Sequence, residues 1–373
     1  MPPVPYYGMV ADGIGYIYFE RFVDGCSRDV RRAVVDLKEQ GAKALVIDMR
    51  GNPGGPLSEA VEVTNLFVPR GQKVVYTKGK LASVNSEHYT KKEPLDVDIP
   101  VAVLVDGSTA SSAEIVSGAW QDWDRAVIVG ERTYGKGLVQ MIREVPYHGS
   151  LKVTTSRYYI PSGRCIQAYD YRHLNPDGSA KTLPDSLTKA FKTAGGREVR
   201  DGGGIKPDVV ITPDSLPSIV YDIATSDVLL DYVNHYVQTH ATIAPAGDFS
   251  LTDADYADFV KMVEESDFTY KRRTEEMMKL LERTARFEGC YEGAKPEFEA
   301  LAAKMKGGVA ADLELPKNKE EIKSVLESDI VARYYFRRGV VQQQLKADKD
   351  LKTALEILTD TERYESLLKP VKK

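Results

Sequence analysis

The feature that most constrains the fold of this chain is a repeated order of apolar strand, glycine-rich turn and amphipathic helix. The apolar residues 44–48 run into the turn 50–55, and a helix with apolar residues on one face is predicted over 57–67. The apolar residues 101–105 lead through a second polar turn into another helix, which carries Ala113 to Ala119. Chains that alternate strands and helices in this way form α/β cores.

The first domain, expected over residues 1–212, departs from this pattern after Gly137. Residues 138–144 and 151–160 have a period of two with turn residues between them, which predicts a β-hairpin. Residues 161–206 are polar and rich in glycine, so we interpret them mostly as loop. The expected first domain is therefore an α/β core with β-hairpin additions.

Residues 213–373 have a different composition and predict a mostly α-helical C-terminal domain. Thr252 followed by Asp255 is typical of a helix N-terminus. Further helices are expected over 268–288, 318–346 and 348–368. Their apolar stripes favour a packing domain over a specific binding groove.

Charge and cysteine content exclude several classes of protein. The 373 residues contain 50 Lys and Arg against 55 Asp and Glu, and this mixed net charge of -5 gives no support for binding to nucleic acid or an anionic membrane. The three cysteines are far apart and cannot form a disulfide framework or a CxxC zinc site. The longest apolar run, 99–105, is far shorter than a membrane span. We therefore expect no metal, no nucleic-acid partner and no transmembrane segment.

The segment 130–137, with the sequence GERTYGKG, allows two interpretations. It satisfies the GxxxxGK pattern of a phosphate-binding loop, which would indicate a nucleotide hydrolase. Two observations count against this: Gly137 has no hydroxyl for a metal ion, and the residues that follow are typical of a strand rather than a helix.

The second interpretation joins Lys136 to Ser111, which begins the helix after strand 101–105. A serine at a helix N-terminus can attack a carbonyl while nearby backbone N–H groups hold the developing oxyanion. A lysine base must be neutral to accept the proton, so it needs surroundings that disfavour its charge. Taken alone, a serine such as Ser111 is more often a helix cap and a lysine such as Lys136 more often a surface residue, and both alternatives stay open.

Five segments in order along the chain carry more specific motifs. They are 44–55 (ALVIDMRGNPGG), 107–115 (GSTASSAEI), 129–140 (VGERTYGKGLVQ), 157–164 (RYYIPSGR) and 203–208 (GGIKPD). Together they resemble the carboxyl-terminal processing peptidases, also called tail-specific proteases, over roughly residues 8–212. The resemblance implies a ClpP/crotonase-like spiral core and endoproteolysis through an acyl-enzyme, without metal or ATP.

The resemblance also implies roles for individual residues. Ser111 corresponds to the nucleophile, Lys136 to the general base and Gln140 to the group that orients the lysine. The backbone N–H groups of Gly55 and Ser112 correspond to the oxyanion hole. Glycine in that turn lets the backbone approach the substrate closely.

Two departures from the family pattern leave questions open. The family usually has Ala after the nucleophile, where this chain has Ser112, so a nucleophile shifted by one residue stays an alternative. The PDZ domain that usually precedes the core in the family is absent from this chain. Arg50 and Glu114 either orient the site or only hold the fold.

The expected partners follow from the resemblance. Substrates are polypeptides that enter through flexible C-terminal tails, and Tyr158 or Tyr159, on a predicted strand, is expected to line their groove. The family implies a periplasmic or cell-envelope location, and the helical region is a candidate surface for a homo-oligomer. The alternative to an enzyme is a catalytically inactive peptide-binding or scaffold module.

Overall fold

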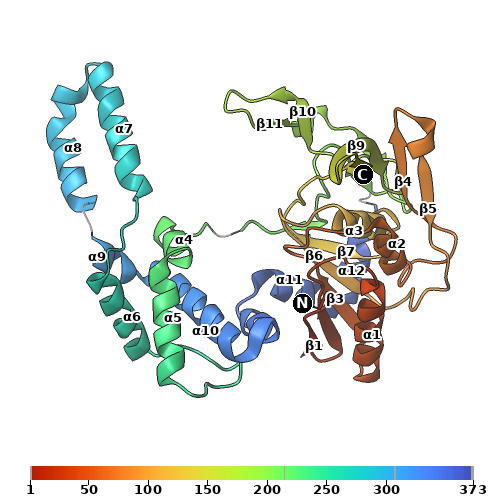
Figure 1. Ribbon diagram of the computed structural model, residues 1–373, viewed down its shortest axis with the longest axis horizontal. Coiled ribbons are helices and arrows are strands. Elements are labelled where there is room, and N and C mark those ends of the chain that lie inside the picture. Colours follow the sequence, from red (N-terminus) through yellow and green to blue (C-terminus); the bar gives the residue numbers. More distant parts are fainter. Residues whose placement is uncertain (1, 214, 306–307, 371–373) are drawn as a thin grey trace. The chain divides into compact units, whose positions relative to one another are not determined.

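The chain forms two compact units in the computed structural model (Figure 1), which describes residues 2–213, 215–305 and 308–370. One unit contains the residues up to Pro213 together with those from Asp348 onward. The other contains the residues between these two stretches. An α/β core followed by a helical region, as the sequence predicts, is confirmed.

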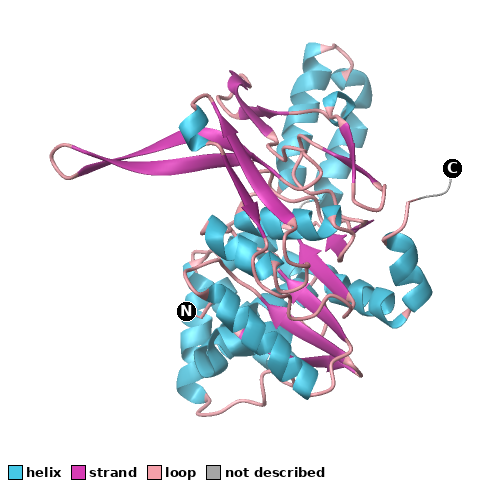
Figure 2. Ribbon diagram, turned by 90° about the vertical axis from the view of Figure 1, so that its right-hand side faces the viewer, coloured by secondary structure: helices cyan, strands magenta, loops and turns pink. Residues whose placement is uncertain are grey.

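The first unit is built on a six-stranded sheet. Its strands lie in the order β1 (Tyr6–Ala11), β2 (Ile14–Tyr18), β3 (Ala44–Asp48), β6 (Val101–Val105), β7 (Val127–Gly130) and β14 (Val209–Val210). Only β1 runs antiparallel to its neighbour, and the other pairs are parallel. Strands β2, β3 and β6 are buried along their whole length, as parallel strands covered on both faces must be. Figure 2 shows strands in magenta and the helices around them in cyan.

Helices from distant parts of the chain cover this sheet. Helices α1 (Cys26–Glu39), α2 (Leu57–Thr64) and α3 (Ser112–Asp122) share one hydrophobic core with alternate residues of the strands. Helix α11 (Lys349–Thr359) contacts β3, β6 and β7, and in α12 (Thr361–Leu367) the Tyr364 hydroxyl accepts a hydrogen bond from the Val101 N–H at 3.0 Å. The last two helices therefore pack with the first unit.

This packing differs from the sequence expectation, which assigned 348–368 to the helical domain. Helix α11 buries Leu351, Ala354, Ile357 and Leu358 on one side. A helical period predicts such a stripe, but it does not tell which core the stripe will join. The partner surface, an α/β sheet, lies far away in the sequence.

A second sheet of the first unit has the order β5 (Ser86–Tyr89), β4 (Lys73–Gly79), β9 (Gly149–Tyr159) and β8 (Leu138–Val145). The predicted hairpin is confirmed as β8 and β9. Residues 161–206, predicted mostly as loop, also form short strands. These are β10 (Tyr169–Leu174), β11 (Ala180–Thr182), β12 (Ala190–Lys192) and β13 (Glu198–Arg200).

The second unit is helical and has its own hydrophobic core. Its helices are α4 (Ser218–Ala224), α5 (Asp227–Thr239), α6 (Asp253–Glu265), α7 (Arg273–Phe287), α8 (Tyr291–Met305), α9 (Val309–Leu313) and α10 (Pro316–Gln344). Phe336, with φ of 55°, interrupts α10. Among the described helices, none has the length and apolar character needed to cross a membrane.

The assignment of α11 to the first unit predicts a selective loss of stability. Ile357→Ala removes a fully buried side chain from α11 and should cost about 2–5 kcal/mol of unfolding free energy. Both tryptophans, Trp120 and Trp123, lie in the first unit, so their fluorescence reports its unfolding in urea. Ile330→Ala, equally buried in α10, is the matched control and should shift only the far-UV circular dichroism. Equal shifts of the fluorescence transition by both variants would contradict this assignment.

Candidate active site

Ser111 stands in a strained turn between strand β6 and helix α3. It precedes the first helical residue with φ of 57° and ψ of -118°, a backbone conformation that costs a non-glycine residue about 1–3 kcal/mol. The neighbouring backbone is held, because the Ala110 N–H donates to the Asn52 carbonyl at 2.9 Å and the Thr109 hydroxyl donates to the Met49 carbonyl at 2.9 Å. Such a turn presents the serine side chain at the end of the sheet.

The buried carboxylate of Glu114 joins the serine turn to the lysine loop. Its Oε2 accepts the N–H groups of Ser111 and Lys136, both at 2.9 Å. Its Oε1 accepts the Thr133 hydroxyl at 2.5 Å and the Gly135 N–H at 2.7 Å. One side chain therefore sets the separation of two loops that lie more than 20 residues apart in the sequence.

Burial and hydrogen bonding have opposite effects on the pKa of Glu114. Burial raises the pKa of the Glu114 carboxyl, and the hydrogen bonds from Thr133 and the backbone N–H groups act in the opposite direction. These four donors fill both oxygens of the carboxylate, as a buried charge requires. Glu114 therefore links the turn of Ser111 to the loop of Lys136.

The turn expected to supply the oxyanion hole packs directly against the serine. A Cβ on Gly54 would lie 2.6 Å from the Ala110 oxygen and 2.7 Å from the Ser112 nitrogen, so only glycine fits there. The Ser112 hydroxyl donates to the Gly55 carbonyl at 2.7 Å. This bond gives a physical reason for serine at a position where the family usually has Ala, since it ties together the two residues expected to donate.

Lys136 lies between two glycines that contact other parts of the unit. A Cβ on Gly135 would lie 2.4 Å from the Ala168 Cβ, and the Gly137 N–H donates to the Gln167 side-chain oxygen at 2.8 Å. The Lys136 side chain is half-buried, and no hydrogen bond joins it to the Ser111 hydroxyl among the described residues. In enzymes without bound substrate, hydrogen bonds between reactive groups are often long or poorly aligned.

The structure corrects the expected role of Tyr158. Its side chain is 2% exposed, so it is not available to line a substrate groove. Its hydroxyl donates to the Lys136 carbonyl and lies 3.4 Å from the Ser111 carbonyl, which makes Tyr158 a support beneath both residues. Tyr159 points to the other side of the strand, half-buried and stacked on Tyr76 with ring centres 5.0 Å apart.

The other expected residue, Gln140, lies on strand β8 opposite Thr154 and is exposed. Within the described residues no hydrogen bond connects it to Lys136. Two residues that the sequence reasoning missed take part instead: Thr133, which binds Glu114, and Gln167, which binds Gly137. Thr133 could have been predicted as a site residue because it is a polar residue inside the motif 129–140. No local sequence feature predicts a role for Gln167.

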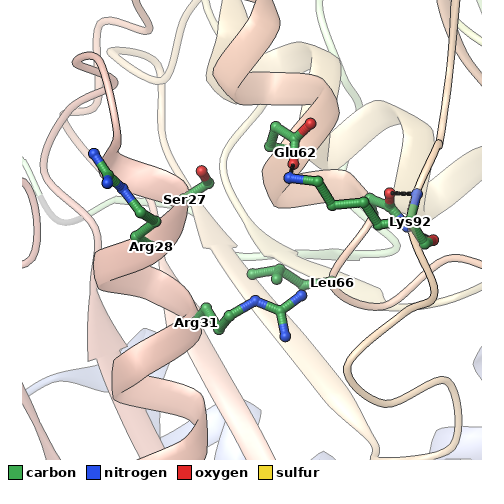
Figure 3. A pocket seen from close by; sticks show the side chains of 7 residues that line it. Ser27, Arg28, Arg31, Glu62, Leu66 and Lys92 are labelled. Atoms are coloured by element: carbon green, nitrogen blue, oxygen red, sulfur yellow. Dashed lines mark hydrogen bonds and ion pairs between the residues drawn. The ribbon is translucent and has the colours of Figure 1, made fainter.

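A pocket outside the candidate active site lies between α1 and α2 (Figure 3). Lys92 and Glu62 both line this pocket, and the Lys92 ammonium forms an ion pair with the Glu62 carboxylate at 2.6 Å. None of the residues that line it belongs to the serine turn or to the lysine loop. Across the described parts of the chain, no group of three His, Cys, Asp or Glu residues is arranged to hold a metal ion.

Comparison with known families gives two matches. Residues 13–180 match the model of peptidase family S41. Residues 219–358 match a model described as "Probable PDZ-protease, C-terminal helical domain". The first match includes every residue of the candidate active site, and the resemblance to the carboxyl-terminal processing peptidases is confirmed over this segment.

The alignments with individual relatives cover only part of this chain and part of each relative. A carboxy-terminal-processing protease of Bartonella bacilliformis is 35% identical over 196 residues, 51% of this chain and 44% of the relative. A carboxyl-terminal-processing protease of Synechocystis sp. is 37% identical over 148 residues, 40% of this chain and 34% of the relative. A solved structure titled photosystem II D1 C-terminal processing protease aligns at 27% identity with a TM-score of 0.41, over 55% of this chain and 44% of that chain. The chain thus spans less than half the length of these relatives.

The geometry predicts that Glu114→Gln is damaging although it is nearly isosteric. The new NH₂ group would face two N–H or O–H donors, at about 1–3 kcal/mol for each donor left unpaired, and the two loops should separate. We expect a lower urea midpoint by tryptophan fluorescence and a roughly 100-fold lower rate of peptide cleavage.

The matched control for this change is Glu327→Gln in the second unit. Glu327 accepts the Leu251 N–H at 2.8 Å and the Ser250 hydroxyl at 3.1 Å. Its loss should leave both the fluorescence transition and the cleavage rate unchanged. Equal behaviour of the two variants would argue against a special role for Glu114.

Proposed function

We propose, starting from residues 13–180 as a segment of peptidase family S41, that this chain is a serine-type endopeptidase with a Ser111 and Lys136 dyad. The observation that carries the proposal is the Glu114 carboxylate, which binds the backbone N–H groups of both residues at 2.9 Å. It holds the serine turn and the lysine loop next to each other, as a dyad of these two residues requires. The family match supports the same reaction class.

The proposed reaction proceeds through an acyl-enzyme. The Ser111 hydroxyl oxygen attacks the carbonyl carbon of the scissile peptide bond, and the neutral Lys136 amine accepts its proton. The resulting oxyanion is held by the N–H groups of Gly55 and Ser112. The protonated Lys136 then donates this proton to the leaving amine as the C–N bond breaks. Water next attacks the acyl carbon and gives a proton to Lys136. That proton returns to the Ser111 oxygen as the ester C–O bond breaks, which releases the carboxylic acid product.

Two features support Ser111 rather than Ser112 as the nucleophile. The Ser112 side chain is 1% exposed, and its hydroxyl already donates to the Gly55 carbonyl. Ser111 is half-buried and stands in the strained turn before α3. Gln140 remains proposed as a group that orients Lys136 once a substrate is bound.

Several finer points belong to the same proposal and rest on the family resemblance. The core is proposed to be a ClpP/crotonase-like spiral, and substrates are proposed to be unfolded chains or flexible C-terminal tails that bind as an extended strand. Tyr159, which is half-buried on strand β9 and stacked on Tyr76, is the aromatic residue proposed to contact them. A periplasmic or cell-envelope location and a homo-oligomer through the helical unit complete the proposal.

Variants of the dyad test the reaction directly. Ser111→Ala and Lys136→Ala should each lower cleavage of an unfolded protein with an apolar C-terminal tail by roughly a thousandfold or more, since the two residues act as one unit. Ser112→Ala is the matched control and should retain far more activity, because it removes only the bond to Gly55. Cleavage that survives in both dyad variants would refute the mechanism. A parent chain that binds the tail but never cleaves it would favour the inactive scaffold.

A dependence on pH follows from the lysine base. Only the unprotonated amine accepts the serine proton, so kcat/KM should rise with pH between about pH 6 and 9. Hydrolysis of a fluorogenic peptide, measured in buffers of constant ionic strength, gives the profile. A flat profile over that range would count against Lys136 as the base.

A further inference from the structure

Arg50 directly precedes the catalytic turn 51–55 and is surrounded by carboxylates. Its Nε donates to the two oxygens of Asp48 at 3.0 and 3.1 Å, and its Nη2 donates to Asp48 at 2.5 Å. On its other edge Nη1 and Nη2 donate to the two oxygens of Asp348, and Nη1 also donates to Asp350 at 3.1 Å. All the nitrogens of the guanidinium therefore have carboxylate acceptors.

One side of this arrangement is fixed to the sheet. Asp48 is the last residue of β3 and is 1% exposed. It accepts the Tyr16 hydroxyl at 2.7 Å and the backbone N–H of Arg50 at 2.9 Å. Asp48 alone, however, leaves the far edge of the guanidinium without an acceptor.

Asp348 supplies that acceptor from a distant part of the chain. It lies 298 positions from Arg50 in the sequence and is the first residue after the stretch that forms the second unit. The same carboxylate accepts the N–H groups of Asp350 and Leu351, both at 3.0 Å, and so caps the N-terminus of α11. The Asp348 carboxylate is held in place by the N–H groups at the start of α11. Its two parallel hydrogen bonds to Arg50 therefore fix the plane of the guanidinium as well as its position.

The position of Arg50 affects the turn 51–55, which follows it directly in the chain. The Gly51 N–H donates to Asp106 at 3.0 Å, the Asn52 N–H donates to the Met49 carbonyl at 3.1 Å, and the Asn52 carbonyl accepts the Ala110 N–H. A displaced Arg50 backbone would therefore shift the proposed donor Gly55 relative to Ser111. Displacements of about 1 Å at a reacting centre cost roughly 100-fold in rate.

We propose that Asp348 is a positioning residue for peptide hydrolysis, which holds the catalytic turn in place through Arg50. This inference rests on the proposed function. It extends that function because Asp348 lies outside residues 13–180, the segment that matches the peptidase family. Asp348 is the first residue after the helical unit. Asp350, with its single contact to Arg50, has a lesser part.

The test is Asp348→Asn in the full chain. Asparagine is also a good N-cap, so α11 should keep its start, while the charge and one of the two parallel acceptors are lost. The rate constant kcat for a fluorogenic peptide should fall roughly 10- to 100-fold. KM should change by less than about threefold, because the oxyanion donors act mainly in the transition state. Asp348→Glu should recover part of the activity.

The matched control is Asp312→Asn, which removes a carboxylate from the Arg272 ion pair within the second unit. It should lower the stability of that unit without changing kcat. Hydrogen exchange measured by mass spectrometry gives a readout that does not need activity. The peptide covering 49–56 should exchange faster in Asp348→Asn and at the parent rate in Asp312→Asn.

Both changes are required by the inference. An unchanged kcat in Asp348→Asn overturns it, and so does an unchanged exchange rate over 49–56. A parent chain that fails to cleave any peptide would contradict the proposed peptidase function instead, and in that case the exchange rates alone decide whether Asp348 holds the turn.

Discussion

The arrangement of the candidate site depends on one buried interaction, the Glu114 carboxylate with its four donors. Removing a carboxylate from water is costly, and the cost is offset only when every oxygen lone pair finds a partner. The chain meets this requirement with the Thr133 hydroxyl and the backbone N–H groups of Ser111, Gly135 and Lys136. The electrostatic need of one side chain thereby holds the turn of Ser111 next to the loop of Lys136. Loosening either loop would leave the buried charge without partners.

The sheet explains why these loops can meet at all. Strands β3, β6 and β7 are adjacent and parallel, so the turns that follow them emerge at the same edge. The turn after β3 carries Gly55, the turn after β6 carries Ser111, and the loop after β7 carries Lys136. Tyr158, from the second sheet, supports the last two from beneath. Three short segments that are distant in the sequence thus emerge at the same edge of the sheet, where Glu114 holds two of them together.

The final helices of the chain add a constraint of a different kind. Helix α11 covers part of the six-stranded sheet, and its cap Asp348 is bound to Arg50 beside the turn 51–55. The second unit, which has its own hydrophobic core, therefore lies in the sequence between the two stretches that form the first unit. The completeness of the α/β core depends on residues that follow the helical unit, which links the correct folding of the first unit to the end of the chain.

Local pattern was enough to predict the alternating strands and helices, the hairpin of β8 and β9, and Ser111 and Lys136 as candidate residues, because period, turn chemistry and motif spacing are properties of neighbouring residues. The motifs also contained Glu114 and its four donors, but nothing in them showed that these groups bond to one another. Burial of Tyr158, the part played by Gln167 and the return of α11 to the first unit were decided only by tertiary structure. Each depends on which surfaces meet, and a helix stripe or a single polar residue does not specify its partner. The sequence by itself therefore determined the chemical groups, and the packing of distant segments decided how they are held.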